Sequence, residues 1–420
     1  MFSPSLLTRS VPRFAGTNSP FNQQTPDQVI PDLGIENTAP VDPKYLQAIT
    51  DVYQSARTRN YSREDDVQEL KQVLERQFGD GSGESIVFAL LPSGTAANFM
   101  SMAPALQDFE AVIASDISHV MTREAGALHH QTGAAIYPIP NQDGKLTVDA
   151  VSAFIDAHNS KGNQTKSIEK VISISQPTEL GTVYSDDEVR ALAELAHKNN
   201  MLIQMDGARL PFVAAKTGKS MKALTTDLGV DMLYIGATRL NMLNAELAIF
   251  LPDFFKNQAT ILQNSYLKGS GELIIDKYFF EEVILRRKLK RSGLLTAQVA
   301  GTARQLVKAF DDDYMIKQAE KAIHAAESLG QRCALVSGVT LWRPVDSNAV
   351  FLSMPKEKYR ELKDLKVFRN LKSFYKTDPD NKDNTVFRLL THPMISPESM
   401  NYFVATLTNL MADLKESPTG

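Results

Sequence analysis

Two spacings of hydrophobic residues alternate along the chain, and together they predict alternating helices and strands. Val67, Leu70, Leu74 and Phe78 fall on one face of a helix, and Gly79 directly after them is a helix stop signal. Short runs rich in Val, Ile and Leu follow, and such runs predict buried strands. The runs lie at residues 85–91, 111–115, 133–139, 171–176, 201–208, 231–237 and 246–251.

Helical patterns separate these apolar runs. One pattern covers residues 96–106. A second covers residues 185–200, where Ser185 and Glu188 have the spacing of a capping box. Apolar strands separated by helices predict an α/β fold, with a mostly parallel sheet covered by helices on both faces.

The last part of the chain has a different pattern, which predicts a second, smaller domain. Helical spacing continues from about residue 256 to 330, and strands then mix with helices up to a last helix opened by Ser396 and Pro397. We therefore expect an extended N-terminal arm at residues 1–40, a large domain at 41–310 and a small α+β domain at 311–420. The strands expected in the small domain lie at residues 339–345, 348–354 and 385–391.

Composition narrows the class of protein. Of the 420 residues 43% are apolar, and the net charge of −4 gives no reason to expect a nucleic-acid partner. No apolar run is long enough to predict a membrane span. Cys333 is the single cysteine, so no intrachain disulfide can form and a reducing, cytoplasmic location is expected. The first 26 residues contain arginines and no acid, which weakly resembles a mitochondrial presequence, although a disordered arm fits them better.

Four polar segments follow predicted strands, where open α/β sheets bind their ligands. Ser93, Gly94 and Thr95 stand between a strand and a helix, so they either bind a phosphate or form an ordinary N-cap. His119 follows the next strand, and it either stacks on a flat ligand or has a structural role. Residues 176–182 are either a third part of this site or a polar loop.

The fourth segment contains Asp206 and Arg209. Asp206 ends an apolar strand, and a buried carboxylate is costly unless it is paired. It could pair with Arg209. It could instead hold the protonated nitrogen of a pyridinium ring, which would leave Arg209 free to bind a carboxylate. The sequence predicts no metal site.

Together these segments describe a pyridoxal phosphate pocket, with an acid for the ring nitrogen, a histidine for stacking, a phosphate-binding turn and an arginine. The stretches "QPTELGTVYS" and "MDGARL", supported by "PSGTAANF", "ISHVMTREAGA" and "GKLT", resemble the low-specificity threonine aldolases. These enzymes belong to the aromatic amino acid β-eliminating lyase/threonine aldolase family. The resemblance covers roughly residues 30–410 and implies the aspartate-aminotransferase-like fold of type I pyridoxal phosphate enzymes.

The resemblance also implies roles for individual residues. Ser93, Gly94 and Thr95 would hold the cofactor phosphate, His119 would stack on the pyridine ring and Asp206 would bind its nitrogen. For the substrate carboxylate, the residues implied are Arg209, Arg388 in "TVFRLLTHP" and Asn37 in "IENTAP". The family's segment matching Tyr61-Ser62 approaches the active site of a neighbouring subunit, so a homodimer or homotetramer is implied.

The sequence departs from the family where the cofactor lysine is expected. Members of the family read Thr-Lys-Asn-Gly there, whereas this chain has Thr238, Arg239, Leu240 and Asn241. A Schiff base needs a neutral amine. The pKa of an arginine is about 12.5 or more, so its neutral fraction at pH 7 is on the order of 10⁻⁵ or lower. A covalent bond between residue 239 and the cofactor is therefore excluded.

A second departure lies in "KRSGLLTAQ", where Leu294 and Ala297 replace a histidine and a lysine of the family pattern. Another lysine could in principle form the Schiff base, and the candidates are Lys216, Lys219 and Lys222. Nothing in the sequence places them at the end of the strand before Arg239.

Three hypotheses follow from these departures. In the first, the chain is a divergent lyase-like enzyme for an amino-acid-like or carboxylate substrate. Arg239 and His119 would then act by electrostatic stabilisation and proton transfer. Pyridoxal phosphate would be held without a covalent bond or would not be used at all. In the second, the chain is a non-catalytic binding protein. In the third, it is a working lyase that cleaves β-hydroxy-α-amino acids to glycine and an aldehyde.

Overall fold

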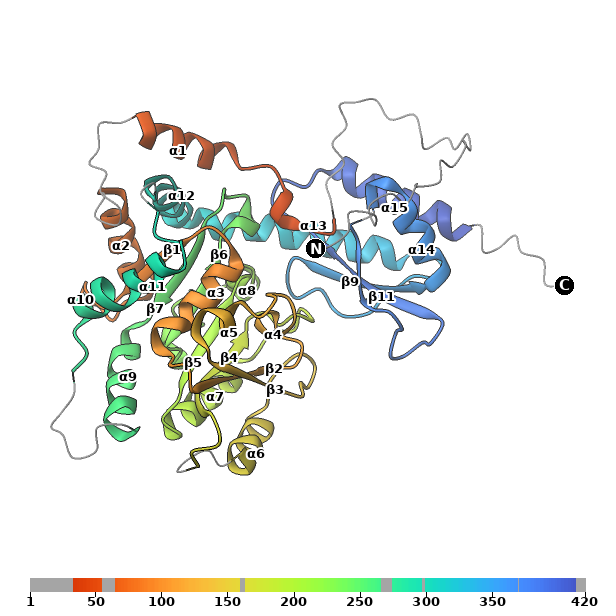
Figure 1. Cartoon of the computed structure of the whole chain (residues 1–420). Helices are drawn as coiled ribbons and strands as arrows, with labels where there is room; N and C mark the ends of the chain where they lie inside the picture. The colour runs from red at the N-terminus through yellow and green to blue at the C-terminus, as the bar shows by residue number, and fades with distance from the viewer. Residues whose placement is uncertain are drawn as a thin grey trace, which may run out of the picture. The chain divides into compact units, whose positions relative to one another are not determined.

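The seven apolar runs within residues 85–251 pair into one seven-stranded sheet (Figure 1). The strand order is β1-β7-β6-β5-β4-β2-β3. β7 runs antiparallel to β1 and β6, whereas the neighbours from β6 to β3 are parallel. The strands are β1 (Val87–Leu91), β2 (Glu110–Ser115), β3 (Ala135–Ile139), β4 (Ile168–Ser175), β5 (Leu202–Gly207), β6 (Met232–Gly236) and β7 (Glu246–Phe250).

The computed structural model describes residues 33–54, 65–158, 163–265, 274–296, 299–368 and 370–412. Most of the predicted N-terminal arm therefore lies outside the described residues, as do Tyr61, Ser62 and Ala297. Among the helices that are described, none combines the length and the apolar character that crossing a membrane requires.

Alternate residues of the sheet face two separate hydrophobic cores. Leu233 and Ile235 of β6 pack with residues of α2 (Asp65–Phe78), α7 (Asp186–Lys198), α8 (Leu210–Thr217) and α12 (Ala300–Phe310). Met232 and Tyr234 of the same strand pack with α3 (Gly94–Met102) and α9 (Pro252–Ser265). This period of two confirms the predicted α/β fold, in which helices cover both faces of a mostly parallel sheet.

The predicted capping box of α7 is also confirmed. The Ser185 side chain accepts a hydrogen bond from the Glu188 backbone N–H, and the Glu188 carboxylate accepts one from the Ser185 N–H. The remaining helices before α13 are α1 (Pro43–Gln54), α4 (His119–Thr122), α5 (Ala127–Thr132), α6 (Val148–His158), α10 (Lys277–Phe279), a π-helix (Phe280–Leu285) and α11 (Arg286–Arg291).

A smaller antiparallel sheet forms from the last part of the chain, in the order β10-β11-β9-β8. Its strands are β8 (Thr340–Leu341), β9 (Ala349–Pro355), β10 (Lys372–Tyr375) and β11 (Asn384–Leu390). The run predicted at 339–345 forms only a two-residue strand, and β10 was not predicted. The small α+β unit is present, while its boundary at residue 311 stays a prediction.

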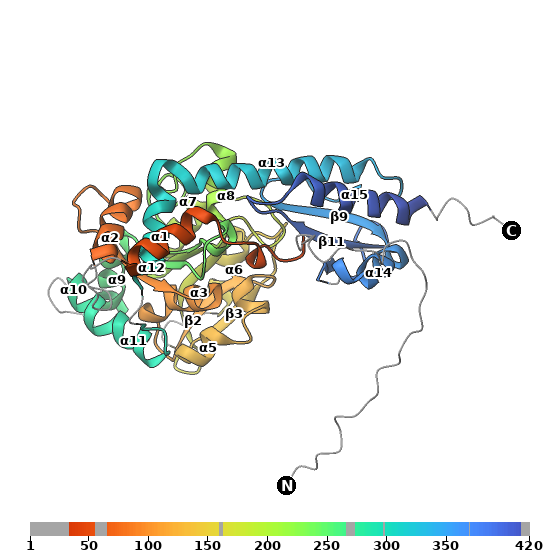
Figure 2. The same cartoon turned by 90° about the horizontal axis from the view of Figure 1, so that it is seen from above.

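Helix α13 (Tyr314–Ala334) connects the two sheets, since it packs on helix α8, which covers the large sheet, and on strand β9 of the small sheet (Figure 2). α14 (Lys356–Asp364) and α15 (Pro397–Ala412) complete the small unit. Cys333 lies near the end of α13 with 0% of its surface exposed, and burial raises the pKa of its thiol to about 12. This thiol is therefore structural rather than reactive.

The N-terminal segment, residues 33–42, crosses between the two sheets. Its first residue accepts a hydrogen bond from the backbone N–H of Leu390 in β11, at 2.7 Å. At its other end, the Asn241 side chain after β6 donates to the Pro40 carbonyl at 2.7 Å, and Tyr314 and Gln318 of α13 donate to the Asp42 carboxylate. These bonds fix the short helix η2 (Glu36–Thr38) between the large and the small sheet.

Replacing Phe250 with alanine should destabilise the large sheet. Phe250 is fully buried, and its ring centroid lies 5.0 Å from that of Phe254 and 4.9 Å from that of Phe280. We expect Phe250→Ala to lower the free energy of unfolding by about 3–5 kcal/mol in urea titrations. Phe109→Ala is the control, because this ring is 48% exposed, and an equal loss in both variants would contradict the packing described.

Candidate active site

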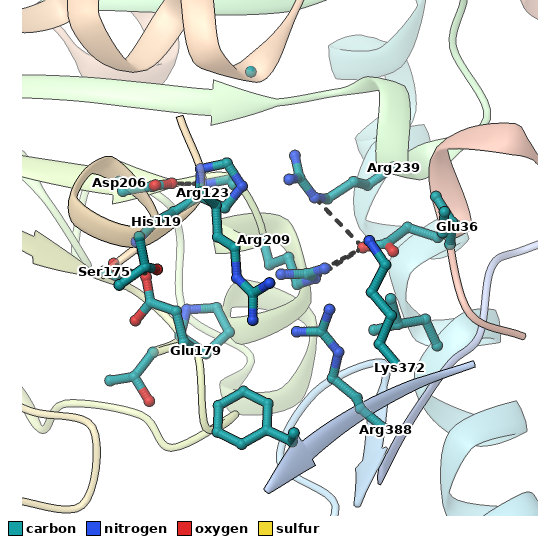
Figure 3. Close-up of a pocket in the computed structure, with 18 of the residues that line it drawn as sticks. Glu36, His119, Arg123, Ser175, Glu179, Asp206, Arg209, Arg239, Lys372 and Arg388 are labelled. Carbon is teal, nitrogen blue, oxygen red and sulfur yellow. Dashed lines mark hydrogen bonds and ion pairs between the residues drawn. The ribbon is translucent and has the colours of Figure 1, made fainter. Parts of the chain in front are cut away.

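A cavity of about 470 Å³ opens beside the carboxyl ends of β4, β5 and β6 (Figure 3). The N-terminal segment, the start of α3, the loop after β2 with α4, and strands β10 and β11 of the small sheet supply its remaining walls. Its volume is in the range of small-molecule sites. Apart from two tyrosines, the lining includes nine titratable side chains, namely Glu36, His119, Arg123, Glu179, Asp206, Arg209, Arg239, Lys372 and Arg388.

Asp206 supplies a carboxylate at the end of β5. It is 8% exposed, and it accepts hydrogen bonds from the Ala208 N–H at 3.0 Å and from the Asn98 side chain at 3.3 Å. The alternative pairing with Arg209 does not form, and Asp206 makes no ion pair with any residue that the structure describes. A buried carboxylate beside a cavity, without a cationic partner, fits a protonated ring nitrogen.

His119 stands at the start of α4, where a network of buried polar groups fixes its ring. The ring Nδ1 lies 2.7 Å from the Glu124 carboxylate, which also accepts a hydrogen bond from Asn98 at 2.9 Å. Asn98 also donates to Asp206. Its side chain therefore links Asp206 to the Glu124 carboxylate, which in turn holds the His119 ring. The His119 side chain remains 40% exposed and lines the cavity, so its ring can contact a ligand.

The three residues predicted to hold a phosphate do not all face the cavity. Gly94 lines it, and a Cβ there would lie 2.5 Å from the Tyr234 hydroxyl, so only glycine fits this position. The Ser93 side chain accepts a hydrogen bond from the Ala96 N–H at 3.3 Å, which is the N-cap alternative. Ser93 and Thr95 are not part of the lining, so the phosphate role of this turn stays a prediction.

Glu36 of the N-terminal segment holds two of the arginines (Figure 3). Its carboxylate accepts from Arg209 through both Nε, at 2.9 Å, and Nη2, and the Nε of Arg239 lies 3.4 Å away. Burial alone would raise the pKa of Glu36. The charges of Arg209, Arg239 and Arg388 outweigh burial and lower that pKa to about 2. A carboxylate of the chain itself thus occupies the place predicted for a substrate carboxylate.

Arg239 lies in the short helix η6 (Thr238–Leu240) directly after β6, and it is 9% exposed. Its Nη1 donates to the Tyr234 hydroxyl at 3.0 Å, and that hydroxyl donates to the Glu246 carboxylate at 3.0 Å. Burial disfavours the charge of Arg239, but the surrounding acidic groups hold its pKa above the ordinary value. The side chain is therefore a fixed cation in the cavity wall.

Arg388 and Asn37, both predicted to bind substrate, also line the cavity. Arg388 comes from β11, and burial together with the nearby charges of Arg209, Arg239 and Arg123 lowers its pKa to about 10. Within the described part of the chain, its guanidinium donates no hydrogen bond and makes no ion pair. The cavity thus brings together His119, Asp206, Arg209, Arg239, Arg388 and Asn37, although their roles remain to be tested.

Sequence reasoning missed several lining residues. Glu36 is next to Asn37, and Glu179 lies in the "QPTELGT" stretch. The sequence therefore predicted that both segments belong to the site, but it did not predict a role for these two side chains. Lys372 gave no signal because its strand is short and polar. The lysines considered at positions 216, 219 and 222 form ion pairs with Glu327, Asp186 and Asp227, and none of the three lines the cavity.

Glu179 is a buried carboxyl group that lines the cavity and has a raised pKa. It accepts hydrogen bonds from the His119 N–H at 2.7 Å and from the Ser175 hydroxyl at 3.0 Å. Burial, followed by the charge of Asp206, raises its pKa to about 7. A carboxyl group that exchanges its proton near pH 7 is suited to general acid–base chemistry. Among the described residues, no group of three or more His, Cys, Asp or Glu side chains could hold a metal ion.

The architecture is shared with solved structures of pyridoxal phosphate enzymes. A threonine aldolase from Leishmania major has a TM-score of 0.74 and 21% identity, and the match covers 91% of this chain and 100% of that one. A PLP-bound putative aminotransferase from Clostridium difficile 630 has a TM-score of 0.59 and 11% identity, with 88% and 89% covered. The chain therefore has the predicted aspartate-aminotransferase-like fold of type I pyridoxal phosphate enzymes.

The sequence also identifies the family. The pattern of the beta-eliminating lyases matches residues 54–357, and the chain belongs to this family. A low-specificity L-threonine aldolase of Pseudomonas aeruginosa is 29% identical over 267 residues, which is 62% of this chain and 68% of that protein. One from Candida albicans is 23% identical over 269 residues, with 63% of each chain covered.

Replacing Glu179 with glutamine should change how stability depends on pH. Because folding raises the pKa of this carboxyl group from 4.5 to about 7, the folded state binds a proton that the unfolded state releases. The stability of the wild type should thus fall as the pH rises from 4.5 to 7, by up to roughly 3 kcal/mol. In urea titrations, the free energy of unfolding of Glu179→Gln should depend less on pH than that of the wild type. An equal dependence on pH in the two proteins would contradict a buried, protonated carboxyl group at Glu179.

Replacing Glu36 with glutamine should leave Arg209 and Arg239 without an anion. We expect Glu36→Gln to lower the free energy of unfolding at pH 7 by about 3 kcal/mol. Folding lowers the pKa of Glu36 from 4.5 to about 2. The difference in free energy of unfolding between the wild type and the variant should therefore be largest above pH 4.5 and should shrink toward pH 2. Glu357→Gln on the exposed face of α14 is the control, and equal effects of the two substitutions would argue against the buried ion pair.

Proposed function

We propose that this protein is a divergent relative of the threonine aldolases. It would act on an amino-acid-like or carboxylate substrate without a covalent bond between a lysine and pyridoxal phosphate. The observation that carries the proposal is the buried, ion-paired guanidinium of Arg239 at the end of β6, beside the cavity that contains Asp206.

Arg239 stands where the family pattern has its cofactor lysine. Its Nη1 donates to the Tyr234 hydroxyl, and its Nε lies 3.4 Å from the Glu36 carboxylate as an ion pair without a hydrogen bond. A protonated guanidinium cannot attack an aldehyde. It can stabilise negative charge on a substrate, which is the role we assign to it.

The substrate site is formed by Arg209, Arg388 and Asn37. The contact of Arg209 with Glu36, in which Nε and Nη2 both donate to one carboxylate oxygen, supports a carboxylate-binding role for this guanidinium. Arg388 faces the same cavity from the small sheet. A carboxylate ligand would either join Glu36 among these arginines or displace it.

The residues present fit pyridoxal phosphate held without a covalent bond. Asp206 would pair with the ring nitrogen, His119 would stack on the ring, and the turn of Ser93, Gly94 and Thr95 would receive the phosphate. When bound, this cofactor supplies an electron sink for a carbanion. Glu179, which contacts the His119 backbone and has a pKa of about 7, is placed to accept or return a proton. Arg239 and His119 would stabilise charge around the reacting atoms.

Two alternatives each have one observation in their favour. A working threonine-aldolase-type lyase needs an amine, and Lys372 is the lysine among the described residues that line the cavity. A non-catalytic binding protein is favoured by Glu36, which occupies the arginines in place of a substrate. A homodimer or homotetramer, a cytoplasmic location and the domain boundaries at residues 40 and 310 remain predictions.

Borohydride trapping distinguishes the proposed function from the lysine-dependent lyase. We expect wild-type protein incubated with pyridoxal phosphate and then reduced to carry no covalent adduct on a cavity residue in peptide mass spectra. Arg239→Lys should gain an adduct at position 239, because a lysine amine can be neutral in a buried, cationic site. The control is Arg360→Lys on the exposed side of α14. A wild-type adduct on Lys372 would overturn the proposal in favour of the lyase.

A further inference from the structure

Two cations stand directly opposite each other on the small sheet. Lys372 of β10 pairs with Arg388 of β11 in the antiparallel register, so both side chains leave the same face. Like charges in directly opposite positions destabilise a sheet. An anion between them would reverse this effect.

Both side chains are directed into the cavity from the small sheet (Figure 3). Neither forms a hydrogen bond or an ion pair with any described residue, and the same holds for the side chain of Arg123 on the opposite wall. The pairing of β10 with β11 is irregular between Ser373 and Tyr375, and all four residues of β10 line the cavity. Irregular pairing of this kind commonly directs side chains into functional sites.

The charges that line the cavity are not balanced. Five cationic side chains face three carboxyl groups, so the net charge is +2 even with every carboxyl ionised. The cations are Arg123, Arg209, Arg239, Lys372 and Arg388, and the acids are Glu36, Glu179 and Asp206. Glu36 already serves Arg209 and Arg239. Lys372, Arg388 and Arg123 are therefore the cations of the lining that make no ion pair with a described residue, and of these Arg388 is stabilised by the nearby charge of Glu36.

We propose that the site takes an amino acid with a second carboxylate, and that Lys372 is the residue that selects for it. This inference rests on the proposed function, since it names the substrate class of the same cavity. The α-carboxylate binds to Arg388 and the second carboxylate to Lys372, which places two anions against the two opposed cations of the small sheet. A monocarboxylic amino acid would leave one of these cations without a partner.

Titration calorimetry with matched ligands tests the proposal. L-Aspartate and L-asparagine differ by one charge in nearly the same shape, and so do L-glutamate and L-glutamine. We expect the wild-type chain to bind at least one of the acids about tenfold tighter than its amide, because a charge-assisted hydrogen bond is lost with the amide. The preference should fall to about twofold or less in Lys372→Gln and should be restored in Lys372→Arg.

Lys376→Gln is the control, since it removes the same charge from an exposed residue outside the cavity. Its preference should equal that of the wild type. Equal binding of acids and amides would overturn the inference and leave the proposed function intact, whereas no binding of any of the four would count against both. A preference that disappears when the protein is saturated with pyridoxal phosphate would show that these cations serve the cofactor phosphate, and would also overturn the inference.

Discussion

The ion pair of Glu36 with Arg209 and Arg239 is the contact on which the organisation of the cavity depends. Arg209 follows β5, Arg239 follows β6 and Arg388 comes from the small sheet, so three guanidinium groups from separate elements converge. Without an anion they would repel one another in a poorly solvated site. Glu36 supplies that anion, and its segment is bonded both to β11 and to the loop after β6.

This arrangement gives the residues directly after β6 a structural role. Arg239 faces Glu36, and the Asn241 side chain donates to Pro40 while its backbone carbonyl accepts from Asp42. Leu240 between them is fully buried in the core. Arg239 and Asn241 therefore both contact the N-terminal segment. Together these two residues join the segment to the loop after β6, where Arg239 lines the cavity.

The sequence predicted the elements that depend on local pattern and missed contacts between distant segments. Alternating apolar runs were enough to predict the large sheet, and the carboxyl ends of its strands were enough to bring Asp206, His119 and Arg209 together. Glu36 and Arg209 are 173 positions apart, and no periodicity encodes their pairing. Ser93 could act as an N-cap or bind a phosphate, and its side chain forms the cap, while the phosphate role of the turn stays a prediction. Lys372 was missed because β10 has only four residues.

The two ends of the cavity have opposite electrostatic character, and this difference constrains any ligand. Among the residues the structure describes, Asp206 makes no ion pair with a cation, and Arg388 and Lys372 make none with an anion. A ligand assembly must therefore place a cationic nitrogen at β5 and anionic groups toward the small sheet. Glu179 and His119 lie on the same lining as Asp206, and the carboxyl of Glu179 titrates near pH 7. The charges of the cavity would orient a ligand, and Glu179 could exchange a proton with it. An enzyme needs both features, whereas a binding protein needs only the first, so the arrangement favours catalysis over simple binding.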